Sequence, residues 1–247
     1  MRKLFSILFL FSSINLFSQG FNWQVSPRFP VEIPNQFYGI GFDYSHVSHF
    51  GNFNLVENQI PCCTFQEGIG TRYGLSLNFE NWLNGTESYN LSLSYNYLQS
   101  NFEIQSVVPT REGDFITRYD FDSKIHFVGI GGFFKKRIPN YKINLSGGIN
   151  LLVNLSDSQT HTEFGISNNV PFRERSLSTG SINESNFLLI EPFVQAGTDL
   201  DMGIGMYASP NLKLGYTLNS YIQDDNWRSF TIGLNIRIYR SFDIIMK

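Results

Sequence analysis

The feature of this sequence that most constrains its fold is a strict alternation of apolar and polar residues. Between Ser88 and Tyr97 every second residue is Tyr or Leu, and the residues between them are Ser or Asn. Alternate side chains of a β-strand point to opposite faces, so this segment predicts a strand with one apolar and one polar face. Similar patterns bring the predicted total to eight strands. The other seven are Tyr38 to Phe50, Arg72 to Glu80, Ile125 to Phe134, Lys142 to Val153, Phe187 to Thr198, Ile204 to Leu218 and Phe230 to Ile238.

The composition agrees with an all-β chain and excludes some functions. Aromatic residues make up 16% of the 247 residues and there are 21 Gly, whereas Ala and Lys are scarce, which disfavours a helical bundle. The net charge is −3, and Lys and Arg are scattered rather than clustered. A chain without a basic patch is not expected to bind nucleic acid.

The first 18 residues have the layout of a secretory signal peptide. Arg2 and Lys3 precede an apolar run from Leu4 to Phe11, and small and polar residues follow. Cleavage before Gln19 fits this layout. A membrane anchor is disfavoured because the run is shorter than the about 20 residues of a spanning helix. No later segment approaches 18 uninterrupted apolar residues, which leaves a soluble exported protein or an outer-membrane barrel.

The connections between the predicted strands alternate between short and long. Short turns at one end and long loops at the other are typical of an up-and-down outer-membrane barrel. We therefore expect an eight-stranded antiparallel transmembrane β-barrel over 38–242, between a periplasmic segment 19–37 and a periplasmic tail 243–247. The four long loops would then lie outside the cell. Short connections lie around Asn84 and Gly85, at 137–141 and at 199–203, and long ones lie at 51–69, 99–124, 154–186 and 219–227.

A soluble barrel of lipocalin type, with its apolar faces inside, is the second architecture. Aromatic residues near strand ends, such as Trp82, Tyr89 and Tyr97, favour the membrane form because they suit the interface between lipid and water.

The long connection 99–124 contains two further alternating segments. Phe102 and Ile104 lie on the parity opposite to Tyr89 and Tyr97, and a β-bulge near 99–101 would account for the change. The segment 110–114 then predicts a hairpin turn, with two strands projecting beyond the bilayer as a ribbon. The alternative is two more membrane strands, which would make ten.

Charged residues fall on the polar parity of the predicted strands. If the apolar faces contact lipid, three acids and three bases share the lumen, namely Asp43, Arg72, Glu80, Glu191, Lys213 and Arg237. An eight-stranded barrel is just wide enough for side chains to fill it. We expect an ion-pair network in place of an apolar core, with a charged pore as the alternative.

The histidines give no pattern of a metal or catalytic site. His46 and His49 are three apart on a predicted strand and therefore lie on opposite faces. His126 is expected to point into the lumen, between Ile125 and Phe127. We expect neither a metal nor a cofactor, and we expect no enzymatic activity.

Two further features belong to the predicted loops. Cys62 and Cys63 are adjacent, and in an oxidising compartment both are expected to be oxidised, with a vicinal disulfide as one form. A metal ligand pair, a redox switch and a cross-link to another chain remain alternatives. The segment 156–185 is rich in Ser, Thr and Asn and is expected to be a mobile, exposed surface.

The chain resembles the small outer-membrane β-barrels of the OmpA and OmpX type, and more closely the OmpA-like and PorT-like barrels of Bacteroidota and their relatives. The features that carry the resemblance are the eight amphipathic strands, the mature start at Gln19, the stretch from Cys62 to Gly70, and a last strand ending in Tyr239 and Phe242. The five residues after Phe242 depart from the pattern, because such barrels usually end on the aromatic residue that the insertion machinery recognises.

These observations predict a non-enzymatic outer-membrane barrel with a structural, adhesive or interaction role carried by its long loops. Its expected partners are outer-membrane lipid and lipopolysaccharide, the barrel insertion machinery, and an extracellular or envelope protein. A small passive pore, a secretion-system accessory barrel (which the PorT-like resemblance implies) and a lipid-modifying enzyme are the alternatives.

Overall fold

The computed structural model describes residues 35–53, 64–110, 113–138, 141–167, 170–182, 184–203, 205–223 and 225–242. The predicted signal peptide, Cys62, Cys63 and the tail 243–247 lie outside these residues. The described residues form ten strands. They are β1 (Gln36–Phe53), β2 (Phe65–Trp82), β3 (Glu87–Thr110), β4 (Gly113–Ile138), β5 (Ile143–Ser167), β6 (Val170–Gly180), β7 (Leu188–Gly197), β8 (Leu200–Gly203), β9 (Met206–Tyr216) and β10 (Asn226–Ser241).

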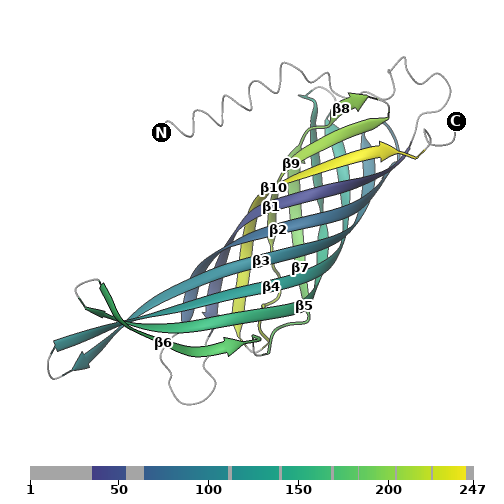
Figure 1. Ribbon diagram of the computed structural model, residues 1–247. Helices are drawn as coiled ribbons and strands as arrows, with labels where there is room; N and C mark the ends of the chain where they lie inside the picture. The colour runs from purple at the N-terminus through teal and green to yellow at the C-terminus, as the bar shows by residue number, and fades with distance from the viewer. Residues whose placement is uncertain are drawn as a thin grey trace.

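Eight of these strands close into a ring of antiparallel neighbours. The order is β1, β2, β3, β4, β5, β7, β9 and β10, and β10 pairs again with β1 from Phe37 opposite Ser241 to Asn52 opposite Asn226. β6 pairs only with β5, and β8 pairs only with β9, so neither is a strand of the closed ring. The expected eight-stranded barrel is confirmed (Figure 1). Closure matters because it leaves no unpaired backbone edge in the barrel wall.

The two ends of the barrel differ. The described ends of the chain and the short turns lie at one end, which we call the terminal end. The longer connections and the ends of β3 to β6 lie at the other, which we call the loop end (Figure 1). In barrels of this kind the short turns face the periplasm and the long loops the exterior. No helix among the described residues is long and apolar enough to cross a membrane.

The strands turn their apolar side chains outward and their polar side chains inward. On β3, for example, Leu91 and Leu93 are half exposed, whereas Ser88 and Asn90 are buried inside. We call the exposed apolar residues of the wall the lipid-facing band. They are Ile40, Phe42 and Tyr44 on β1; Tyr73, Leu75 and Leu77 on β2; Tyr89, Leu91, Leu93 and Tyr95 on β3; Ile130 and Phe134 on β4; Leu145, Ile149 and Leu151 on β5; Val194 on β7; Leu212 on β9; and Phe230, Ile232, Leu234 and Ile236 on β10.

The expected bulge near 99–101 is wrong. β3 pairs with β4 without a register shift from Glu87 to Thr110, and with β2 up to Phe102. Phe102 points inward like Asn90, but it points into an apolar layer. The apolar face changes sides because the strand leaves the lipid, so its outer face meets water and its inner face packs against other side chains.

β3, β4 and β5 are 24, 26 and 25 residues long. A membrane strand needs about 9–11 residues, so more than half of each lies beyond the bilayer. Beyond the band they join β6 in a four-stranded sheet, which we call the ribbon (Figure 1). The ten-strand alternative is wrong, because the segments around Phe102 and Phe121 continue β3 and β4. The hairpin expected at 110–114 is present, since β3 ends at Thr110 and β4 begins at Gly113.

The segment 156–185 is not the mobile surface that its composition suggests. β5 and β6 pair across it from Gln159 opposite Gly180 to Ser167 opposite Val170. Ile182 is buried in the apolar cluster at the loop end. Cross-strand hydrogen bonds and this one anchor therefore order a segment that has few apolar residues.

Candidate functional site

The inward face of the barrel carries the candidate site, and its centre is Glu191 on β7. The Arg72 guanidinium on β2 donates two hydrogen bonds to the Glu191 carboxylate, one of them 3.1 Å from Nη2 to Oε1. Lys213 Nζ on β9 lies 2.9 Å from Glu191 Oε1, and Asn150 Nδ2 on β5 donates to the same oxygen at 3.1 Å. Inward parity on four strands thus brings three of the six predicted residues into one buried network.

Glu80, a fourth predicted residue, belongs to a second network near the terminal end. Lys135 Nζ on β4 lies 2.7 Å from Glu80 Oε1 and 3.4 Å from Asp199 Oδ1, and Arg137 Nη2 lies 2.7 Å from Asp199 Oδ2. Burial alone would raise the pKa of Asp199, but the charges of Lys135 and Arg137 outweigh it and hold this pKa below its ordinary value.

The sequence analysis missed Lys135, Arg137 and Asp199. The segment around Lys135 has apolar residues on both parities, so the sequence does not reveal its inward face. Asp199 falls in a predicted turn, where an acid is expected to meet water. The signal that could have found Lys135 is its parity with Phe127 and Phe133, provided that these were known to point inward.

Aromatic rings surround Lys135 and fill the lumen at the terminal end. Its Nζ lies 4.8 Å from the ring centroid of Trp82, 5.2 Å from that of Tyr207 and 5.7 Å from that of Tyr239. Tyr207 and Tyr239 stack with centroids 4.9 Å apart. The carboxylates and the aromatic faces both stabilise the ammonium group of Lys135. This group of side chains obstructs the lumen at the terminal end.

Asp43 and Arg237, the last two predicted residues, are not ion-paired with each other. Arg237 Nη1 donates to Gln195 Oε1 at 3.1 Å, and its guanidinium lies 4.4 Å from the ring centroid of Phe133. Asp43 is half-buried. Both line a cavity between the two networks with a volume of about 20 Å³. Since one water needs about 10–15 Å³, this cavity admits one small molecule or ion and no continuous column of water.

A cluster of buried apolar side chains fills the loop end, and we call it the plug. Its members are Val47, Phe53, Phe65, Leu98, Phe102, Tyr119, Phe121, Ile125, Phe127, Leu152, Ile182, Leu189, Tyr221, Ile222 and Trp227. Trp227 stacks on Phe53 and on Tyr221, with centroids 4.9 Å apart in both pairs. Burial in the plug raises the pKa of Tyr221 to about 12.

His49 lies against the plug in a defined tautomer. Trp227 Nε1 donates to His49 Nδ1 at 2.9 Å, and His49 Nε2 lies 2.7 Å from Ser100 Oγ. An indole N–H can only donate, so Nδ1 is unprotonated and Nε2 donates its proton to Ser100. A histidine that activates a serine must accept the proton of the serine hydroxyl. His49 cannot do so in this tautomer, because its Nε2 donates to the Ser100 hydroxyl.

His46 and His126 lie on the outer surface of the barrel. His46 is exposed and His49 buried, so the expectation that they lie on opposite faces is confirmed. His126 does not point into the lumen as expected. Its Nδ1 lies 2.6 Å from the hydroxyl of Tyr95, on the outer surface. The expectation failed because the inward face of β4 is apolar at this level, where Ile125 and Phe127 point into the plug.

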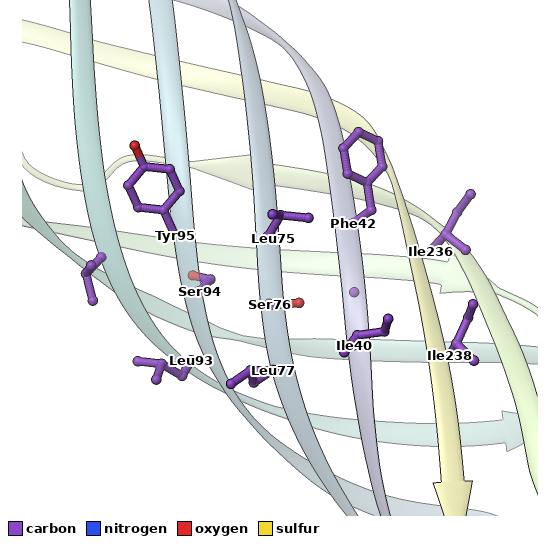
Figure 2. A pocket seen from close by; sticks show the side chains of 12 residues that line it. Ile40, Phe42, Leu75, Ser76, Leu77, Leu93, Ser94, Tyr95, Ile236 and Ile238 are labelled. Carbon is purple, nitrogen blue, oxygen red and sulfur yellow. The ribbon is translucent and has the colours of Figure 1, made fainter.

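A shallow groove crosses the lipid-facing band from β10 over β1, β2 and β3 to β4, with a volume of about 690 Å³. Figure 2 shows side chains such as Phe42, Leu75 and Ile236 around it. Its lining is apolar apart from Ser76 and Ser94, which suits contact with acyl chains. A closed antiparallel ring with an apolar outer band and polar interior can be stable only in a bilayer. The protein is an outer-membrane β-barrel.

No protein-family model and no curated protein matches the chain. Among solved structures, Neisserial surface protein A shares 12% identity over 82% of this chain and 96% of its own, with a TM-score of 0.40. Ail of Yersinia pestis, solved with the heparin analogue sucrose octasulfate, shares 11% over 83% of this chain and 99% of its own, with a TM-score of 0.32. The outer membrane protease OmpT from Escherichia coli shares 10% over 84% of this chain and 97% of its own, with a TM-score of 0.35.

Proposed function

We propose that this protein is a non-enzymatic outer-membrane barrel that serves as a closed anchor for its ribbon, which contacts partners outside the cell. The observation that carries the proposal is the combination of an obstructed lumen with strands more than twice as long as a membrane strand needs. A barrel built for transport would keep its lumen open, and a barrel with no external role would not extend three strands beyond the bilayer.

The interior supports a closed barrel at three levels. The plug fills the loop end, the network around Glu191 crosses the middle, and the aromatic group around Lys135 fills the terminal end. The cavity of about 20 Å³ in the middle is too small for a hydrated ion path. These contacts disfavour the passive pore.

The geometry around His49 supports the absence of hydrolytic chemistry. His49 and Ser100 form a close serine–histidine contact, and both side chains are buried. Its tautomer is wrong for a general base, as argued above. The described residues also contain no group of three His, Cys, Asp or Glu side chains arranged to hold a metal ion.

The ribbon supports an interaction role because it presents a mixed surface to water. Arg118 lies 3.1 Å from Asp120 and its guanidinium 4.8 Å from the ring of Phe164, and Val107 is exposed. Arg118, Asp120 and Phe164 are half-buried. Arginine and aromatic residues are enriched in protein contact surfaces. The partner we propose is an extracellular or envelope protein, with outer-membrane lipid, lipopolysaccharide and the insertion machinery as the partners of the barrel wall.

Planar-bilayer recording tests the closed anchor. We expect purified protein to insert without a stable conductance, and we expect the double variant Phe102→Ala and Trp227→Ala to show brief openings. A stable large conductance of the unmodified protein would favour the passive pore and refute the proposal.

A variant without the β3–β4 tip of the ribbon tests the interaction role. Residues 105–118 are replaced by Asn-Gly, because Ile104 and Tyr119 are directly opposite and a two-residue turn can join them. We expect this variant to reach the outer membrane folded and to lower the retention of displaying cells on a cell monolayer. Equal retention with and without this tip would contradict the role.

A further inference from the structure

The cavity between the two ion networks has an unbalanced lining. Its charged residues are three cations and two carboxylates, namely Arg72, Lys213 and Arg237 against Asp43 and Glu191. The second network is balanced, since Lys135 and Arg137 face Glu80 and Asp199. One positive charge therefore remains beside the cavity. An arginine cannot lose its proton in a protein, so the imbalance cannot be removed by titration of Arg237.

Arg237 is the cation that the protein does not neutralise. Arg72 and Lys213 both contact Glu191. Arg237 is 7% exposed, and it contacts neutral groups: Gln195, Tyr239 and the ring of Phe133. No carboxylate of the described residues lies within 4.0 Å of its guanidinium nitrogens. A buried charge without a counter-charge is strongly unfavourable.

Two buried donors beside the cavity have no acceptor among the described residues. They are Nε of Arg237 and Nε2 of Gln195, whose side chain is 4% exposed. Both residues line the cavity and come from β10 and β7, the two strands that flank β9 in the ring. The Gln195 carbonyl already accepts from Arg237, so the donor of this amide is the group left without a partner.

We infer that this cavity binds one monatomic halide, chloride under ordinary conditions, through Arg237 and Gln195. The excess charge selects an anion over a water molecule. The volume of about 20 Å³ admits a single atom and excludes phosphate, sulfate and carboxylate ligands. The halide would neutralise Arg237 and accept from both free donors. This inference goes beyond the proposed anchor and does not depend on the ribbon.

Bromide diffraction gives the direct test. The full chain is refolded into detergent in sodium bromide, so that access to the closed interior does not limit occupancy, and is then crystallised. We expect an anomalous peak between Arg237 and Gln195. Density for water without an anomalous signal at that place would overturn the inference.

Thermal unfolding gives an independent test, read as the heat-dependent shift of the folded band on a detergent gel. At equal ionic strength we expect chloride or bromide to raise the midpoint of the unmodified protein over gluconate by about 2–4 °C. Sulfate is too large for the cavity, although it strengthens burial generally. The site signal is therefore the chloride-over-gluconate difference.

Matched variants separate the site from general salt effects. Arg237→Gln should abolish the difference, Arg237→Lys should keep part of it, and Asp43→Asn should increase it because it removes a nearby negative charge. Arg240→Gln, on the exposed face of β10, should leave it unchanged. An equal chloride effect in Arg237→Gln and in the unmodified protein would overturn the inference.

Discussion

Single polar residues replace the apolar core of this barrel, and Glu191 shows how. Its carboxylate accepts from Arg72, Lys213 and Asn150, which come from three other strands. Each donor side chain is long enough to reach into the lumen, so one carboxylate links four strands of the ring: β2, β5, β7 and β9. Such an ion pair has a high desolvation cost and adds little net stability over an apolar core, but removal of one partner leaves the others unpaired.

We expect Glu191→Gln to lower the free energy of unfolding by about 3–5 kcal/mol, because two buried cations lose their carboxylate. Urea unfolding in lipid vesicles measures this loss. Glu174→Gln, at an exposed position of β6, is the control and should cost less than about 0.5 kcal/mol. Similar values for the two variants would show that the lumen network does not hold the barrel together.

The lowered pKa of Asp199 has a consequence for acid stability. A carboxyl whose folded pKa lies below its unfolded value stabilises the fold above the unfolded pKa, about 3.9 for Asp, and this contribution is lost as pH falls through the folded pKa. We expect the unfolding free energy of the native protein to fall below about pH 4 more steeply than that of Asp199→Asn. Parallel pH profiles would contradict the prediction.

At the scale of the strand, β3 shows that one element can serve two solvents. Between Tyr89 and Tyr95 its apolar residues face outward, and from Leu98 to Phe102 they face inward, with no break in register. The strand itself does not change. The medium outside the strand changes from lipid to water toward the loop end. The outer face of the strand is therefore apolar where it contacts lipid, and the inner face is apolar where the outer face meets water.

We expect a fluorophore on a single cysteine at position 93 to be quenched by brominated acyl chains, and one at position 94 not to be quenched. The background carries Cys62→Ser and Cys63→Ser. Leu93→Arg should also lower the unfolding free energy by about 2–4 kcal/mol if the position lies near the bilayer midplane, whereas Ser94→Thr should cost much less. The opposite order of quenching would contradict the lipid-facing band.

At the scale of the whole molecule, the closed ring and the obstructed lumen act together. Each strand of the ring pairs with two neighbouring strands, so unfolding must break the backbone hydrogen bonds of several strand pairs at once. The plug and the group around Lys135 add contacts between strands that are not neighbours in the ring, such as that between Phe53 on β1 and Phe121 on β4. The barrel is therefore braced across its lumen as well as around its wall.

We expect the mature protein to fractionate with the outer membrane and to migrate differently on a detergent gel before and after heating, because a closed barrel without free edges resists unfolding in detergent. Membrane fractionation followed by unheated and heated gel samples measures both. Recovery from a soluble fraction would be incompatible with the lipid-facing band.

The sequence by itself determined the strand number, the barrel class and the polar parity, because period-two alternation is local and follows from β geometry. It also identified Arg72, Glu80, Glu191 and Lys213 as inward residues. It could not reveal Lys135, Asp199 or the outward position of His126, since their strands or turns carry no polar parity of their own. The position of each of these side chains depends on whether the lumen at its level is filled by apolar or by polar side chains. That filling comes from residues far apart in the chain, such as Trp227, which packs on Phe53. Only the closed ring brings such residues together.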